Sequence, residues 1–410
     1  MAEPVAQAIP IVQAFNVDET MDNINEAKEA FQKMLKDKNK WGFLFLILVI
    51  LFLIWLIFLY IRQKLNLKVW NNNTMIDSYK VLDGPSIGPI GNDHKYLLRD
   101  YYVASSYNSC CGGGVEKDFV DMTPLRTVIS QGARLLDFEI YSKNGEPVVA
   151  AGPGPNPNGK YCLKGTYNSI PFRKAMNGAS MFAFNSAHSP NATDPLFLSF
   201  RIKTNNSNIY PVMAKAIASV FGGRFLGPKY SNNGIYNKSG NDIIANIPLK
   251  KLQQKVIIII QDPTNNYKGT PFEEFINISG KGADGNGMPF VTIYKNIDVV
   301  QAYDPESIKE ENKKFLGISM PPFSKTSTNP PATIHHNYGI QFVMMNYSYL
   351  DANMLAYRNF FMNRGTAFRL KPDHLRYFDK KIANPTPQDP KLSYGPKQVS
   401  MLGGAYKPSL

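Results

Sequence analysis

The longest apolar pattern in the chain is one uninterrupted hydrophobic run near its N-terminal end. Residues 41–61 have the sequence WGFLFLILVILFLIWLIFLYI, with no charge and no proline. At about 1.5 Å per residue, a helix of this length reaches roughly 30 Å, the thickness of the hydrocarbon core of a bilayer. Trp41 and Tyr60 stand at its ends, where amphipathic rings prefer the membrane interface. The run therefore predicts one transmembrane helix, and a buried core helix is the weaker interpretation.

The segments on either side of this run differ in pattern. Residues 1–40 form a tail in which residues 18–38 predict a helix, with acidic residues at its start and an apolar stripe of Met21, Ile24, Phe31 and Leu35. That helix either lies on the membrane surface, pairs with a partner helix, or is a solvated extension of the span. Residues 62–95 are polar and Asn-rich and contain GPSIGPIGND, which predicts a linker or stalk.

Beyond residue 95, short apolar segments alternate with amphipathic ones. The central apolar segments are hydrophobic on both faces, which indicates a parallel sheet covered by helices. The remaining length favours a closed TIM-type α/β barrel over an open sheet. We expect strands at 101–105, 133–141, 147–151, 196–202, 255–261, 290–294, 340–347 and 367–370, and helices at 123–131, 212–221 and 352–361.

Two further stretches look irregular. Residues 264–332 contain clusters of Pro, Gly, Ser and Thr and the charged stretch PESIKEENKK. We expect an insert or a partly ordered linker there, between one half-barrel at 96–263 and a second at 333–378. Residues 379–410 form a Pro-rich tail that runs over a surface or docks on a neighbour.

The charge of the chain narrows the choice of partners. Its 410 residues carry a formal net charge of +13. Anionic lipid head groups are natural partners for a basic domain that is anchored in a membrane. Nucleic acid is disfavoured, because the Lys and Arg residues are scattered and no helix-turn-helix, zinc or RRM signature is present. The three cysteines show no spacing typical of a zinc site.

Several segments carry a more specific likeness, and they occur in a fixed order. The first three are DYYVASSYNSCCGGG at 100–114, ISQGARLLDFEIYSKNGEPVVAAG at 129–152 and DPLFLSFRI at 194–202. The last two are NYGIQFVMMNYSY at 337–349 and FFMNRGTAFRLKPDHLR at 360–376. In this order they resemble the X and Y halves of phosphatidylinositol-specific phospholipase C. The resemblance implies a distorted TIM-type barrel of the phospholipase C-like phosphodiesterases.

The resemblance also identifies positions that matter for catalysis in the family. One family histidine is the general base on the inositol 2-hydroxyl, and a second stabilises and protonates across the phosphate. The first position is Tyr107 in this chain and the second is Ala151. Tyrosine titrates near pH 10 and alanine carries no proton to transfer, so neither replaces an imidazole.

The calcium site that the resemblance implies is only partly present. Asn108 matches its family counterpart, and Asp137 and Glu139 match in type with the two acids exchanged. The last family glutamate corresponds to Arg201, which brings a fixed positive charge. We expect this guanidinium to pair with Asp137 or Glu139 and to fill the degenerate site. A structural ion pair is favoured over calcium, and no cofactor is expected.

The rest of the family's substrate pocket is also altered. The lysines that hold inositol phosphates correspond to Ile259 or Ile260 and to Gln261, and the tyrosine under the inositol ring corresponds to Phe368. Three other histidines, His188, His335 and His336, are candidates for a rearranged catalytic group. A lone histidine in a loop is more often solvated than catalytic.

The sequence leads to a favoured function and two alternatives. The favoured one is a membrane-anchored, catalytically silent phospholipase C-like barrel that serves as a structural or binding module. The alternatives are an active, calcium-dependent phosphoric diester hydrolase with rearranged residues, and a lipid head-group binder without turnover. An Asn-rich chain of this kind would suit a large DNA virus. There it would be a minor virion protein that links an internal membrane to capsid proteins.

Overall fold

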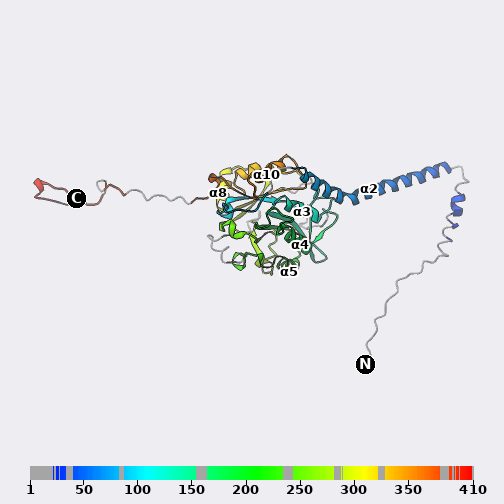
Figure 1. Ribbon diagram of the computed structural model, residues 1–410, viewed down its shortest axis with the longest axis horizontal. Coiled ribbons are helices and arrows are strands. Elements are labelled where there is room, and N and C mark those ends of the chain that lie inside the picture. Colours follow the sequence, from blue (N-terminus) through cyan, green and yellow to red (C-terminus); the bar gives the residue numbers. More distant parts are fainter. Residues whose placement is uncertain are drawn as a thin grey trace, which may run out of the picture.

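The computed structural model describes most of the chain. It covers residues 40–82, 87–153, 165–232, 243–280, 290–321 and 328–378 without interruption. Shorter described pieces are 22, 25–26, 28–33, 163, 234, 288, 387–389, 392, 394–396 and 398–408. Figure 1 shows a compact barrel from which one long helix projects.

Eight parallel strands form a near-closed barrel. Their order is β7-β6-β5-β2-β1-β10-β9-β8. Three short strands are antiparallel additions: β3 (Glu146–Ala150) pairs with β2 and with β4 (Ile170–Pro171), and β11 (Phe368–Leu370) pairs with β1. The barrel strands are β1 (Tyr101–Ser106), β2 (Leu135–Lys143), β5 (Leu196–Ile202), β6 (Val256–Gln261), β7 (Ile276–Ser279), β8 (Val291–Lys295), β9 (Leu316–Met320) and β10 (Phe342–Met345).

Helices cover the outside of the strands, so that most strand residues are buried on both faces. The main ones are α3 (Met122–Ser130), α4 (Phe172–Ala183), α5 (Ile209–Phe221), α8 (Pro305–Lys314) and α10 (Ala352–Met362), with shorter α7 (Asn296–Val300) and α9 (Ala332–Asn337). The expected α/β barrel is confirmed, and each strand and helix expected beyond residue 95 is present within a few residues of its expected limits.

The two end strands of the barrel, β7 and β8, approach each other at a glycine. A Cβ atom on Gly280 would lie 2.0 Å from Cδ1 of Ile293, a distance no real side chain tolerates. Glycine at this position therefore lets the end of β7 come close to β8.

Residues 264–332 are not an insert, contrary to the expectation from the sequence. They contribute β7, β8 and β9, three of the eight barrel strands, as well as α7 and α8. A strand was expected at 290–294, where β8 lies, but β7 and β9 were not expected; their sequences INIS and LGISM are short and interrupted by polar residues or glycine. Such segments lack the continuous apolar run that identifies a buried strand in a sequence, which explains the error.

The expected stalk at 62–95 is also wrong over most of its length. One helix, α2 (Lys40–Lys80), runs from the apolar segment to the barrel over 41 residues. Its polar half bonds to the loop after β1: the Asn71 side chain donates to Asp118 (2.7 Å), and the Asn72 side chain donates to Asp121 (2.7 Å). Asparagine is a poor helix former in isolation, but here tertiary hydrogen bonds stabilise the helical conformation.

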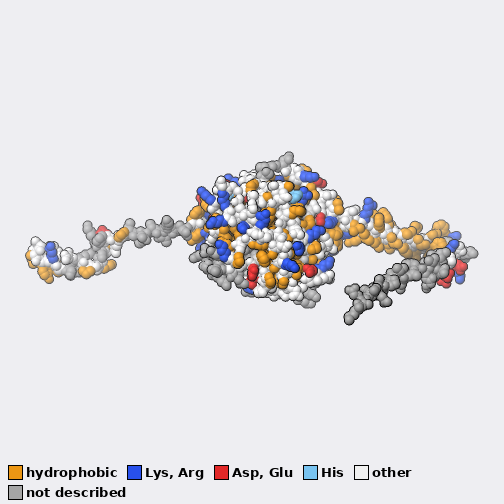
Figure 2. Space-filling view, turned by 60° about the horizontal axis from the view of Figure 1, so that its bottom comes forward, with side chains coloured by type: hydrophobic (Ala, Val, Ile, Leu, Met, Phe, Trp, Pro, Cys, Tyr) orange, Lys and Arg blue, Asp and Glu red, His pale blue; other side chains and the backbone are white. Residues whose placement is uncertain are grey.

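The apolar half of α2 projects away from the barrel and is covered with exposed hydrophobic side chains (Figures 1 and 2). Within the described part of the chain, α2 is the one helix long and apolar enough to cross a membrane. Of the helix expected at 18–38, the described positions 28–33 are helical, and much of the remainder lies outside the described residues. The tail at 379–410 is described in pieces and includes a 3-10 turn at Leu402–Gly404.

Candidate functional site at the carboxyl end of the barrel

The polar residues singled out in the sequence meet inside the barrel at the carboxyl ends of β1, β2 and β5. In the parallel pair β2–β5, Asp137 is in register with Ser199 and Glu139 with Arg201. Residues two apart on a strand point to the same side. Both carboxylates therefore face the interior of the barrel mouth together with the Arg201 guanidinium, and all three side chains are at most 7 % exposed.

Arg201 occupies the centre of this cluster. Its Nε donates to Oδ1 of Asp137 at 3.0 Å, and its Nη2 donates to Oδ2 of the same carboxylate at 2.7 Å. Its Nη1 donates to Oε1 of Glu139 at 2.7 Å. The ion pair expected with one of the two acids is thus formed with both.

Residues after β1 close the cluster from one side. The Asn108 side-chain oxygen accepts from Nη2 of Arg201 at 2.6 Å, and its backbone N–H donates to Oδ2 of Asp137 at 3.0 Å. Asn108 has a φ of 43°, a left-handed conformation that asparagine tolerates better than most residues. The Tyr107 ring lies 4.4 Å from the guanidinium carbon of Arg201, and its hydroxyl accepts from Nη1 at 3.3 Å.

The remaining carboxylate oxygens also have partners. Oε2 of Glu139 accepts from the Tyr141 hydroxyl at 2.9 Å and from the Gly152 N–H at 3.0 Å. Oδ1 of Asp137 accepts from the Ser199 hydroxyl at 3.1 Å. Ala151, which the resemblance aligns with the second family histidine, is buried directly before Gly152. The sequence analysis missed Tyr141 and Ser199, although each is two residues from a named acid or from Arg201 on the same strand.

The electrostatics of the cluster keep Arg201 charged. Burial alone lowers the pKa of Arg201, but Asp137, Tyr107 and Glu139 together raise it well above its usual value. Burial also raises the pKa of Tyr107 to about 12, against the opposing effect of Arg201. The phenol is therefore neutral at physiological pH, and it is a hydrogen-bond partner of the cation, not a base.

These residues do not fit a calcium ion. Calcium takes six to eight oxygen ligands. The oxygens of Asn108, Asp137 and Glu139 already accept hydrogen bonds, and a guanidinium lies where the three side chains converge. Among the described residues, no group of three or more His, Cys, Asp and Glu side chains is arranged to hold a metal ion.

The remnants of the substrate pocket are placed at different depths. Ile259 and Gln261 on β6 are in register with Ser199 and Arg201, so they line the same interior. The Gln261 amide donates to the Met320 sulfur at 3.0 Å. Phe368 lies deeper, against Phe197 with ring centroids 6.5 Å apart, and is fully buried. The structure therefore does not bring Phe368 to the mouth with the other residues.

All five histidines of the chain lie in described residues, and none is in the mouth. His94 and His188 precede β1 and β5, His335 and His336 lie on α9 before β10, and His374 follows the antiparallel β11. His94, His188 and His374 thus lie toward the amino-terminal end of the barrel strands, whereas His335, on the outer helix α9, bonds through its ring to Ser319 near the end of β9 (2.9 Å). The Tyr102 hydroxyl donates to the His336 carbonyl at 2.6 Å, which places the His336 backbone beside the start of β1.

Comparisons with known proteins agree with the barrel fold. Residues 95–262 match the model of the phosphatidylinositol-specific phospholipase C X domain. The chain contains a phospholipase C-like barrel. It is similar to the crystal structure of PLC21 from L. pealei, with a TM-score of 0.56 and 19 % sequence identity over 71 % of this chain. PLC21 from S. officinalis gives 0.55 and 19 % over 72 %.

The likeness to solved structures, at 19 % identity, establishes the fold of the phospholipase C-like barrel. The chain covers 39 % of the length of each PLC21 structure. No curated protein matches the sequence. The activity of the chain therefore has to be argued from its own residues.

Proposed function

We propose that the chain is a membrane-anchored phospholipase C-like barrel that is catalytically silent and acts as a structural or binding module. The observation that carries this proposal is the seat of the Arg201 guanidinium between Asp137 and Glu139. A cleavage site needs a vacant mouth in which charge can be stabilised as it develops. Here the guanidinium already pairs with both carboxylates of the mouth in the resting protein.

The lack of a proton carrier supports the same proposal. Phosphodiester cleavage of this kind needs a positioned group that takes and returns a proton near neutral pH. Tyr107 has a pKa of about 12 and is already bonded to Arg201, and Ala151 has no titratable group. None of the five histidines bonds to the Arg201 cluster: three lie toward the other end of the barrel strands, and His335 and His336 lie on the outer helix α9.

The proposed anchor is the apolar half of α2, residues 41–61. It has no charged residue, and its side chains are exposed in the chain by itself. Such a surface is stable in hydrocarbon and unfavourable in water. The Lys and Arg side chains are spread over the barrel face shown in Figure 2, which suits weak contact with anionic head groups more than one nucleic-acid groove.

The barrel is also proposed to bind protein partners. A silent barrel on a membrane anchor is suited to link that membrane to another protein layer. In the viral setting proposed from the sequence, the partners are capsid proteins and the membrane is the internal membrane of the virion. Cross-linking of purified particles followed by mass spectrometry tests this, and cross-links from the barrel to a capsid protein are the expected result.

Silence is tested by an activity assay with the full chain in phosphatidylinositol vesicles with added calcium. We expect no inositol phosphate release above protein-free vesicles. Calcium-dependent release that Asp137→Asn abolishes would support the active diesterase and overturn the proposal. Anchoring is tested separately by carbonate extraction. The wild type is expected to stay with the membrane, and Leu51→Lys/Ile54→Lys to be extracted, because each central lysine costs about 3 kcal/mol.

A further inference from the structure

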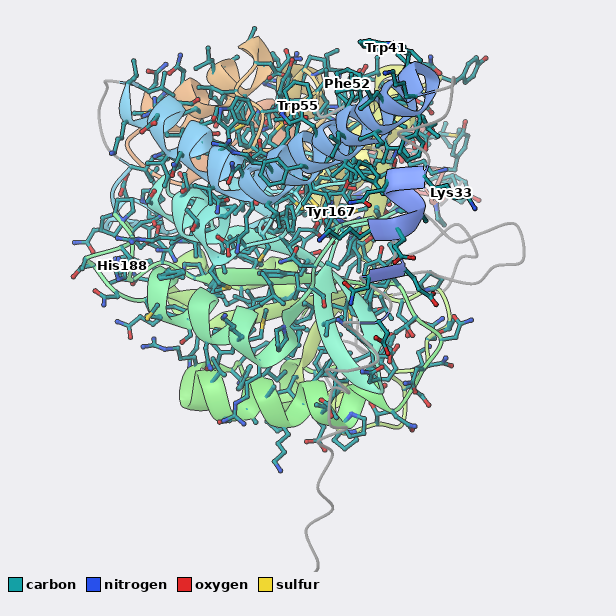
Figure 3. All side chains as sticks on the ribbon, turned by 90° about the vertical axis from the view of Figure 1, so that its right-hand side faces the viewer. Lys33, Trp41, Phe52, Trp55, Tyr167 and His188 are labelled. Atoms are coloured by element: carbon teal, nitrogen blue, oxygen red, sulfur yellow. The ribbon has the colours of Figure 1, made fainter. Side chains whose placement is uncertain are left out.

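A cleft lies at the amino-terminal end of the barrel strands, away from the Arg201 cluster. It has a volume of about 550 Å³ and lies between α9, the end of α10 and the turn that follows β11, beside Tyr102 at the start of β1. Figure 3 shows the two ends of the barrel: Tyr167, from a loop beside the mouth, lies beneath α2, whereas His188, which precedes β5, lies at the far edge. A cleft of this volume suits one small-molecule ligand.

The lining of the cleft contains two carboxylates, and both already have partners. The Asp93 carboxylate lies 2.8 Å from Nδ1 of His94, and the Asp373 carboxylate pairs with Arg376. The acids of the lining are thus engaged by side chains close to them in sequence, and not by the three other cations of the lining.

These three cations have no carboxylate partner in the described part of the chain. Arg364 is exposed and makes no side-chain hydrogen bond there. The Arg369 guanidinium carbon lies 3.8 Å from the centroid of the Phe360 ring, and Nη1 donates to the Phe360 carbonyl at 2.7 Å, so that its Nε and Nη2 remain available. Lys371 is 1 % exposed and donates to the Asn312 carbonyl at 2.9 Å. The cleft therefore presents an excess of positive charge.

The cations of the lining are close enough to repel one another. Burial and then the positive charge of Arg364 lower the pKa of Arg369. Burial lowers the pKa of Lys371 well below its usual value, and the nearby Asp100 carboxylate opposes this effect only in part. An anion bound in the cleft would stabilise the charged forms of both side chains.

The lining also contains a buried polar atom without a partner. His336 is 5 % exposed, and its ring packs between Tyr102 and Phe360 with centroid distances of 4.6 and 4.2 Å. Its Nε2 has no hydrogen-bond partner. Buried polar groups are normally satisfied, and a neutral imidazole with its proton on Nε2 can donate to an anion. Thr333 and Asn337, also in the lining, are partners for hydroxyl groups.

We propose that this cleft binds the phosphate group of a phosphate monoester. A guanidinium matches the oxygens of a phosphate in geometry as well as in charge, so Arg364 and Arg369 are the expected direct contacts. Lys371 adds to the positive potential from its buried position, and Nε2 of His336 supplies one further donor. A soluble sugar phosphate and the head group of a phosphorylated lipid share this chemistry. The site is separate from the Arg201 cluster, so it does not depend on whether the mouth is silent.

The test measures binding to the full chain in phosphatidylcholine nanodiscs by isothermal titration calorimetry. Glucose 6-phosphate is the probe, and glucose is the control that lacks the phosphate group. We expect saturable binding of glucose 6-phosphate and none of glucose. Absence of saturable binding of glucose 6-phosphate, or equal binding of the two sugars, would overturn the proposal.

Nanodiscs that contain phosphatidic acid identify the source of the ligand. The head group of this lipid is a phosphate monoester, whereas phosphatidylglycerol, the control lipid, carries a phosphate diester. If glucose 6-phosphate binds more weakly with phosphatidic acid than with phosphatidylglycerol, a lipid head group competes for the cleft. Equal binding with the two lipids would assign the cleft to soluble phosphates.

Matched arginine variants test the location of the site. Arg364→Ala should weaken the binding of glucose 6-phosphate roughly tenfold or more, because it removes a charge-assisted hydrogen bond. Arg126 is likewise exposed, on α3 and outside the lining of the cleft. Arg126→Ala should therefore leave the affinity within about twofold of the wild type, since a distant surface charge is screened by salt. Equal affinities of the two variants would contradict the proposed site.

A second pair of variants tests the histidine. His336→Phe keeps a ring between the two aromatic neighbours but removes the Nε2 donor, so we expect several-fold weaker binding of glucose 6-phosphate. His188→Phe is the control: Nδ1 of His188 also lacks a partner, and its ring packs against Phe182 with centroids 5.4 Å apart, but it lies outside the lining of the cleft. It should bind as the wild type does. If both variants bind as tightly as the wild type, His336 is not part of a phosphate site and the proposal fails.

Discussion

Arg201 holds Asp137 through two parallel contacts, with Nε 3.0 Å from Oδ1 and Nη2 2.7 Å from Oδ2. This is the bidentate geometry in which guanidinium and carboxylate match best. The same side chain also donates to Glu139, so one buried cation serves two buried anions. The side chains of Arg201, Asp137 and Glu139 are almost fully buried. Replacing all three with neutral side chains should therefore destabilise the fold less than removing one of them, which leaves a buried charge without its partner.

The first prediction follows from that asymmetry. Arg201→Met should lower the free energy of unfolding by roughly 3–5 kcal/mol, because it leaves two buried carboxylates without their cation. Arg201→Met/Asp137→Asn/Glu139→Gln should recover most of the loss, because no net charge then remains buried. Denaturant unfolding of the full chain in detergent, followed by tyrosine fluorescence, measures both. A single variant within about 1 kcal/mol of the wild type would show that the ion pair is not structurally important.

The second prediction concerns calcium. Arg201→Glu replaces the cation with a carboxylate next to Asn108, Asp137 and Glu139, which recreates an all-oxygen set of the kind calcium prefers. The variant should be strongly destabilised in a chelator and should gain thermal stability as calcium is added. The wild type should show no such gain. Magnesium at the same concentration is the control, and an equal shift with both ions would indicate nonspecific charge screening.

The sequence predicted the site better than it predicted the outer parts of the fold. The family resemblance assigns Asp137, Glu139 and Arg201 to one altered calcium site, and this was enough to anticipate an ion pair. It did not show that Arg201 binds both acids, since that depends on the register of β2 and β5. Phe368 was assigned to the pocket by motif alone, and its depth depends on the pairing of β11 with β1.

The missed parts of the fold share one physical cause. The strands β7 and β9 and the polar half of α2 are stabilised by neighbours, not by local preference. Their sequences are short, polar or Asn-rich, and they form regular structure only because the barrel supplies hydrogen bonds. A pattern-based analysis of one sequence therefore sees linkers where tertiary contacts create elements.

The third prediction is an acid sensitivity that depends on His336. The pKa of His336 is lowered to about 3. Burial of the ring is the largest cause, and the nearby His335, Arg369 and Lys371 lower the pKa further. An unfolded histidine titrates near 6.5. Between these values the unfolded chain binds a proton that the folded chain does not, so stability falls as the pH falls from about 6.5 to 4. His335, with a pKa lowered by burial to about 4, acts in the same direction.

The matched variants are His336→Phe and His374→Phe. The His336 ring stacks on Phe360 with centroids 4.2 Å apart, and its Nε2 has no hydrogen-bond partner, so phenylalanine suits the site. Between pH 6.5 and 4, the free energy of unfolding of His336→Phe should fall less steeply than that of the wild type. The difference between the two slopes should be up to about 1.4 kcal/mol per pH unit. The exposed His374 should give the wild-type slope. Asp194, whose pKa burial raises to about 6, opposes the trend equally in all three proteins. Parallel slopes for wild type and His336→Phe would rule out a role of His336.

The last prediction tests whether residues 264–332 are part of the barrel. Gln341 on the chain just before β10 is fully buried, and its amide nitrogen donates to the carbonyls of Arg99 (2.9 Å), Asn312 (3.0 Å) and Phe315 (2.9 Å). Its side-chain oxygen accepts from the Gly317 N–H at 2.7 Å. This one amide therefore joins the 3-10 turn that precedes β1 (Leu98–Asp100), the end of α8 and the start of β9.

Gln341→Leu keeps the approximate volume but removes the side-chain partner of the Arg99 and Phe315 carbonyls and of the Gly317 N–H, whereas the Asn312 carbonyl still accepts from Lys371 Nζ at 2.9 Å. Each buried unsatisfied group costs about 1–3 kcal/mol, so we expect a loss of about 3 kcal/mol or more. Gln261→Leu is the control, because that side chain is less buried and bonds only weakly to the Met320 sulfur. It should cost less than about 1 kcal/mol. If residues 264–332 were a dispensable insert, Gln341→Leu and Gln261→Leu would lower the free energy of unfolding by the same amount. Removal of α8 would then also leave the unfolding midpoint unchanged. The four bonds of Gln341 argue against both outcomes.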